Sequence, residues 1–145
     1  TPILYTLKDR QSITESVAIN WGFKDELFFI HLNQKQNSKE GIAQYRKTKV
    51  SLLELNKIST ITSSLVDCKT LTVFEELLET HENIISEILK TPTIKTLLFP
   101  EYRRSIKSLG AWGGDFIMVT ASQKDLQYFK NKGYQTIIPF AEMTL

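Results

Sequence analysis

The stretch that decides the fold reads SIKSLGAWGGDFIMVT, residues 105–120. Two apolar runs, each typical of a β-strand, flank a loop that holds three of the chain's six glycines. Glycine permits positive φ and close approach of the backbone to a ligand. Trp112 is a large side chain where an ordinary turn favours a small polar one. We therefore expect a strand–loop–strand unit whose loop is a candidate site.

The residues around this unit predict an α+β domain. Upstream, apolar residues recur every three or four positions over residues 71–89, which is typical of an amphipathic helix. Downstream, Ser122 is expected to cap a helix that ends at Gly133, and residues 134–139 read as a closing strand before a short tail. The order of helix, strand, loop, strand, helix, strand predicts an antiparallel sheet with helices on one face and a ferredoxin-like C-terminal half.

The N-terminal part alternates short apolar runs with polar turns. The runs at residues 3–7, 13–19 and 27–32 predict a short β meander, with the last run central in a sheet. We expect residues 1–36 to be β segments that continue from a missing N-terminal domain, and residues 37–145 to form the α/β domain. Further helices are expected from Asn37 or Ser38, across residues 52–65, and from Thr91-Pro92 with Ile94, Leu97 and Leu98 buried.

Composition excludes several classes of protein. A net charge of +2 does not indicate a nucleic-acid partner or a membrane surface, and no apolar run approaches the ~20 residues of a membrane-spanning helix. His31 and His81 lack ligand spacing, so no metal site is expected. The single cysteine, Cys68, suits the reducing cytoplasm. The start at Thr1, without Met or a signal pattern, indicates a cut inside a longer protein.

The glycine loop is the first candidate site. Gly110, Ala111, Trp112, Gly113 and Gly114 can turn backbone N–H groups toward phosphate oxygens, with Lys107 and Ser108 supporting an anion. A hairpin with a wide glycine turn explains the same spacing equally well. Asp115 either orients a hydroxyl or a magnesium ion, or accepts hydrogen bonds from turn N–H groups, and we favour the turn.

A second candidate follows the apolar strand at residues 27–32. Asn33, Lys35, Gln36, Asn37 and Ser38 can hydrogen-bond a polar substrate, and the expected helix start favours an anion. An ordinary capped connection accounts for the segment as often. The glutamates of the helix at residues 71–89 read as a solvated face, and its His81 as a core or boundary residue. The chain supplies no complete catalytic set.

Three segments together resemble the C-terminal half of a GHMP kinase of the bacterial GYDIA type. They read FFIHLNQKQNSKEGIAQYR at residues 28–46, HENII at residues 81–85 and IKSLGAWGGDFI at residues 106–117. The resemblance implies that residues 110–114 match the family's third, glycine-rich motif, which shapes the site near phosphates and substrate. Trp112 and Asp115 depart from the wider family pattern.

The resemblance implies a fragment of an ATP-dependent kinase that phosphorylates a hydroxyl of a sugar or a mevalonate-like acid. ATP and Mg2+ would then act in the full-length protein, with neither held tightly by this chain, and the isolated chain would be inactive. The alternative is a non-catalytic ligand-binding or oligomerisation module with a ferredoxin-like fold. Exposed strand edges would favour a homodimer.

Overall fold

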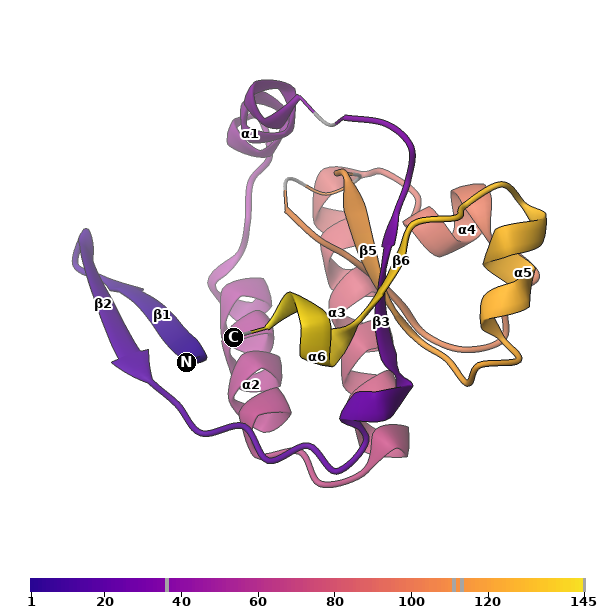
Figure 1. Ribbon diagram of the computed structural model, residues 1–145. Helices are drawn as coiled ribbons and strands as arrows, with labels where there is room; N and C mark the ends of the chain where they lie inside the picture. Colours follow the sequence, from indigo (N-terminus) through magenta and orange to yellow (C-terminus); the bar gives the residue numbers. More distant parts are fainter. Residues whose placement is uncertain (36, 111, 113, 145) are drawn as a thin grey trace.

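The computed structural model describes residues 1–35, 37–110, 112 and 114–144. The described chain forms two antiparallel sheets and a set of helices (Figure 1). The strands are β1 Ile3–Lys8, β2 Gln11–Ser16, β3 Leu27–His31, β4 Ile106–Ser108, β5 Phe116–Thr120 and β6 Ile137–Pro139. The helices are α1 Ser38–Arg46, α2 Leu52–Val66, α3 Leu71–Leu89, α4 Ile94–Leu98, α5 Leu126–Asn131 and α6 Phe140–Met143, with a short 3-10 helix at Lys24–Glu26.

The larger sheet has the strand order β4-β5-β3-β6, and each neighbouring pair is antiparallel. Counted along the chain from β3, this order is 2-3-1-4, the strand order of ferredoxin-like folds. Helices separate β3 from β4 and β5 from β6, so two crossover connections join parallel, non-adjacent strands. The α+β class and the antiparallel sheet with its helices are confirmed.

The helices cover both faces of this sheet, whereas the sequence prediction placed them on one. On one face, Leu27 and Phe29 of β3 pack with Phe74 and Leu78 of α3. On the other face, alternate residues of β3 and β5 pack with α4 and α5. The physical reason is that β3 is apolar and buried on both sides, and such a strand requires cover on both.

The N-terminal strands form a separate hairpin instead of a meander that leads into the sheet. β1 pairs only with β2 among the described strands, through a turn at Asp9 and Arg10 whose φ values are 50° and 64°. Figure 1 shows this hairpin standing apart from the larger sheet. β3 is an inner strand of the larger sheet, so a domain boundary after residue 36 would separate β3 from the strands it pairs with.

Helix ends follow local side-chain chemistry, with some differences from expectation. Asn37, one of the two residues expected at the start of this helix, caps α1, and Thr70 caps α3. The helix expected from Thr91-Pro92 begins instead at Ile94, because Thr93 supplies the cap. Leu97 is 55% exposed rather than buried. Ser122 bonds to Asp125, which is the N-cap of α5, and the expected C-terminal tail contains the short helix α6.

Candidate pocket between helices α1 and α3 and the glycine loop

A pocket of about 290 Å³ lies between α1, the second half of α3 and the loop that follows β4. It brings residues far apart in the sequence to one place, including the first glycine of the loop. Its lining residues are Gly41, Ile42, Tyr45, His81, Ile85, Leu89, Lys107, Ser108, Gly110 and Trp112. The pocket therefore joins parts of all three segments that carry the sequence resemblance.

Helix α1 forms one wall and is held by few contacts. The Gln44 amide donates to the carbonyl oxygen of Leu89 at 3.2 Å and to the Thr91 hydroxyl at 3.0 Å, both at the end of α3. α1 has no buried residue, and its apolar Ile42 and Tyr45 are half exposed (49% and 50%). These two side chains line the pocket instead of filling a core.

The glycine loop supplies the second wall. Gly110 and Trp112 have left-handed backbone conformations, with φ of 64° and 51°. A left-handed conformation costs about 1–2 kcal/mol for a residue with a side chain, so Trp112 is a strained position. Beyond it, Leu32 donates its N–H to the backbone oxygen of Asp115 at 2.8 Å, which ties the loop to the end of β3. The predicted site residues Ala111 and Gly113 lie outside the described residues.

Lys107 and Ser108, predicted to support an anion, are both engaged by Glu82 of α3. The Lys107 ammonium lies 3.1 Å from Glu82 Oε1 and donates to the Ser108 carbonyl oxygen at 2.9 Å. The Ser108 hydroxyl donates to Glu82 Oε2 at 3.0 Å. Glu82 is 4% exposed. The positive charge of Lys107 is therefore neutralised inside the protein.

His81 and Trp112, which line this pocket, each carry a buried polar atom without a hydrogen-bond partner. Among the described residues, His81 Nδ1, Trp112 Nε1 and Tyr128 Oη are the buried side-chain polar atoms without a hydrogen-bond partner. Burial, together with the charge of Lys107, lowers the pKa of His81 from 6.5 to about 4. The imidazole is therefore neutral near pH 7. Buried unpaired groups are rare, and each needs an explanation such as a water or a ligand.

The second predicted site, at residues 33–38, lies away from this pocket. Asn33 has a φ of 58°, and its amide donates to the Gly133 carbonyl oxygen at 3.1 Å, so it links the end of β3 to the turn after α5. Lys35, Asn37 and Ser38 line a separate shallow hollow, and Asn37 is occupied as the cap of α1. Gln36 lies outside the described residues. The segment positions α1, and α1 in turn forms the pocket wall.

The acidic residues of α3 are not a uniformly solvated face, which corrects the sequence interpretation. Arg104 lies 3.1 Å from Glu75, 3.4 Å from Glu26 and 3.5 Å from Asp125. Burial disfavours its charge, yet the hydrogen bond and the charge of Glu75 raise the pKa of Arg104. Glu75 also accepts from the hydroxyl of Thr120 at 3.1 Å. This network holds α3 to the sheet, because the lysine and arginine partners come from other elements.

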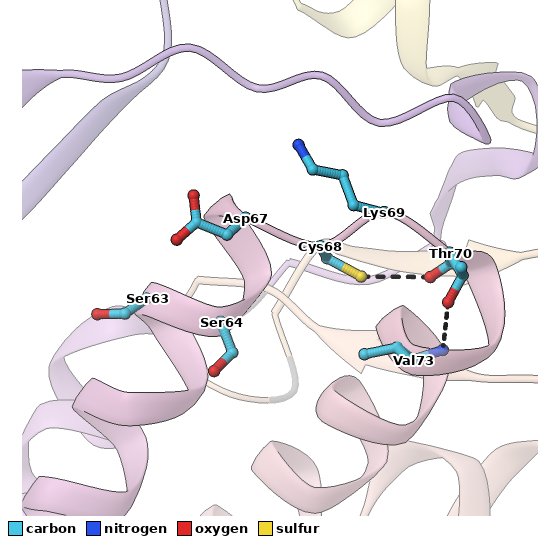
Figure 2. Close-up of a pocket in the computed structure, with 7 residues that line it drawn as sticks. All are labelled: Ser63, Ser64, Asp67, Cys68, Lys69, Thr70 and Val73. Carbon is cyan, nitrogen blue, oxygen red and sulfur yellow. Dashed lines mark hydrogen bonds between the residues drawn. The ribbon is translucent and has the colours of Figure 1, made fainter.

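A second hollow, of about 450 Å³, lies where α2 ends and α3 begins (Figure 2). The Cys68 thiol there donates to the Thr70 carbonyl oxygen at 3.2 Å. The Thr70 hydroxyl accepts from the Val73 N–H at 3.3 Å. Figure 2 shows both bonds inside the connection between the two helices. They serve the turn and the helix cap, so this hollow carries no argument for a ligand.

Sequence reasoning missed His81, Glu82 and the apolar residues of α1 and α3 as parts of the site. One signal was available: His81, Ile85 and Leu89 are spaced by four, so they lie on one face of the helix. A histidine within such an apolar line requires either a partner or a role. The burial of Glu82 had no signal, because its partners Lys107 and Ser108 come from β4.

Comparison with known proteins adds no relative. No family model, no curated protein and no solved structure matches the chain. Within the described residues, no group of three or more histidine, cysteine or acidic side chains could hold a metal ion. No helix in the described part of the chain has the length and apolar character to cross a bilayer. Fold and pocket thus define an α+β protein with a ferredoxin-like strand order and a small, mostly apolar pocket.

Proposed function

We propose that the chain is the C-terminal part of an ATP-dependent small-molecule kinase of the GHMP type. Its substrate would be a hydroxyl of a sugar or of a mevalonate-like acid. One observation carries the proposal: Gly110 and Trp112 of the glycine motif line a ligand-sized pocket with His81 of α3. Ligand sites combine apolar walls with a few polar groups in this way. A cytoplasmic location belongs to the same proposal.

In this proposal ATP and Mg2+ act in the full-length protein. Magnesium takes one or two carboxylates beside substrate phosphates, and the described residues of this chain contain no group of three or more histidine, cysteine or acidic side chains that could hold a metal ion unaided. Lys107, the cation of the pocket, is paired with Glu82. In this proposal the nucleotide loop and the metal ligands belong to an N-terminal half, and this chain alone does not transfer phosphate.

The part that this chain plays is to position the substrate. Holding a reacting hydroxyl in line with a phosphoryl group replaces a costly encounter in solution with a local reaction. The rigid support is α3, which is fixed to the sheet by the Arg104–Glu75 pair. The second support is α1, which is held to the end of α3 and to Thr91 through Gln44.

ATP turnover by the full-length protein, measured with a panel of sugars and mevalonate-like acids, tests the proposal. We expect turnover of at least one alcohol by the full-length protein and none by the isolated chain. Trp112→Ala should reduce the specificity constant about tenfold or more, because it removes a pocket wall. Lys69→Ala, at the other end of α3, is the control. Absence of turnover with every alcohol would overturn the kinase proposal. Turnover by the isolated chain would overturn the proposal that an N-terminal half is required.

A second candidate, an oligomerisation module, is favoured by the β1–β2 hairpin. Ile3, Tyr5 and Leu7 share one face of β1 and are 62%, 60% and 65% exposed. An isolated two-stranded hairpin is marginally stable, so a covering surface would stabilise it. Light scattering should show a dimer that Tyr5→Lys dissociates, whereas Thr6→Lys on the opposite face should not. A monomer at every concentration would remove this candidate.

A further inference from the structure

We propose that the pocket between α1, α3 and the glycine loop binds the uncharged aliphatic part of a hydroxyl-bearing ligand, and that Glu82 excludes anions from it. This inference rests on the proposed function in one respect: the aliphatic part is taken to belong to the kinase substrate. The binding preference itself follows from the charges, walls and unpaired atoms of the pocket.

The charges at the pocket wall favour a neutral ligand. Both carboxylate oxygens of Glu82 are occupied, one by the Lys107 ammonium and the other by the Ser108 hydroxyl. The pair leaves no net charge at the pocket wall. An anionic ligand at Lys107 would meet the Glu82 carboxylate beside the ammonium, so the pair attracts it less than an unpaired lysine would. The anion support predicted from Lys107 is thus already taken.

The walls of the pocket are mostly apolar, and its volume is small. Ile42 and Tyr45 of α1 face Ile85 and Leu89 of α3 across the pocket. A volume of about 290 Å³ is at the lower end of ligand sites, so it suits a small molecule or one part of a larger one. Burial of aliphatic carbon against these walls is favourable in proportion to the apolar area removed from water.

Two of the lining side chains carry a buried polar atom without a partner, which is unfavourable in a folded protein. Indole N–H is only a donor, whereas His81 Nδ1 donates or accepts according to its tautomer. Both atoms are covered by the protein, so an alcohol, which donates and accepts, would supply the missing partner once the Trp112 or His81 side chain turns toward the pocket. A neutral imidazole and a neutralised lysine do not attract an ion.

Three probes with one carbon skeleton test this inference: isoamyl alcohol, isovalerate and isoamylammonium. Each is titrated into the chain near pH 7 and followed by proton–nitrogen correlation NMR, with Trp21→Phe assigning the indole signal of Trp112. We expect the alcohol to shift that signal, and both ions to bind about tenfold more weakly or worse. Equal binding of isovalerate, or an unmoved Trp112 signal, would overturn the inference.

Variants of Glu82 test the cause of the preference. Glu82→Gln frees the charge of Lys107 and should strengthen isovalerate binding about tenfold. Glu79→Gln is the matched control, because Glu79 is an exposed acid on the same helix that pairs with Lys95. Should Glu82→Gln fail to fold, the double variant Glu82→Gln/Lys107→Met restores neutrality and should keep the preference for the alcohol. An unchanged affinity for isovalerate in a folded Glu82→Gln protein would overturn the role of Glu82.

Failure of the probe titrations is distinguishable from failure of the kinase proposal. Probe binding needs no nucleotide and no turnover, whereas the kinase test measures only ATP consumption. A full-length protein that phosphorylates an alcohol, while its pocket binds no probe, would keep the kinase and reject the aliphatic pocket.

Discussion

The two ends of α3 use buried polar side chains in opposite ways. Toward its start, Glu75 accepts hydrogen bonds from Arg104 and from the Thr120 hydroxyl, so both of its carboxylate oxygens are paired. Toward its end, Glu82 is equally well paired, but His81 beside it keeps an unpaired nitrogen in a pocket. Fully paired polar groups fix the position of a helix, whereas a buried unpaired group requires an explanation such as strain, a water or a ligand. The same helix therefore has a structural end and an end suited to binding.

The largest expected effect on stability comes from breaking the ion pairs at the start of α3. Arg104→Met removes the ion pairs to Glu75, Glu26 and Asp125 and leaves Glu75 without its charge partner. We expect a loss of about 2–3 kcal/mol of unfolding free energy, less than for a fully buried pair because Arg104 keeps 23% of its side chain exposed. Urea unfolding measures it. Arg103→Met, at the exposed neighbouring position, should change stability by less than about 0.5 kcal/mol, and an equal loss there would contradict the network.

The next effect concerns protonation of His81 at the other end. Its pKa falls from 6.5 to about 4 on folding, so between these values the unfolded chain holds a proton that the folded chain does not. Stability should therefore decline as the pH falls from 6.5 to 4, by about 1–2 kcal/mol after allowance for partial exposure. Unfolding curves across this pH range measure the decline. His81→Gln should remove that contribution and His31→Gln should keep it; an identical pH profile for His81→Gln would contradict the pKa shift.

The smallest effect on stability is expected at the strained tryptophan. Trp112→Gly relieves the left-handed backbone while losing some packing, so the net change should stay within about 1 kcal/mol. Binding of isoamyl alcohol should nevertheless be lost, because the residue forms a pocket wall. Thermal unfolding and probe titration measure the two effects.

Gly133→Ala is the matched backbone control for this substitution. Its φ is 93°, it lies outside the pocket, and nothing approaches an added Cβ. It should cost about 1 kcal/mol and leave probe binding intact. Unchanged probe binding in Trp112→Gly would show that the tryptophan is not part of the site.

Much of the fold could be predicted, because local patterns dominate it. The apolar spacing of α3 and the caps Asn37 and Thr70 depend on neighbours in sequence. The prediction placed the helices on one face of the sheet, whereas α3 packs on one face and α4 and α5 on the other. The apolar run at residues 27–30 does indicate a strand buried on both faces, but the prediction did not use it for helix placement.

The candidate site could be predicted only in part. The glycine loop was found because its composition is unusual within a short stretch, whereas Asn33 proved to link β3 to a distant turn. His81 and Tyr45 could not be placed together, since no local rule relates α1 to α3. The kinase function and its substrate stay predictions.

The sequence by itself determined most of the strands and helices, where several helices begin, and that the composition of residues 110–114 is exceptional. It could do so because hydrophobic period, capping and glycine content are local properties. Only the tertiary structure decided that Glu82 neutralises Lys107 and that α1, α3 and the glycine loop line one pocket. Those facts depend on pairing between segments more than 20 residues apart, which short-range physics does not specify.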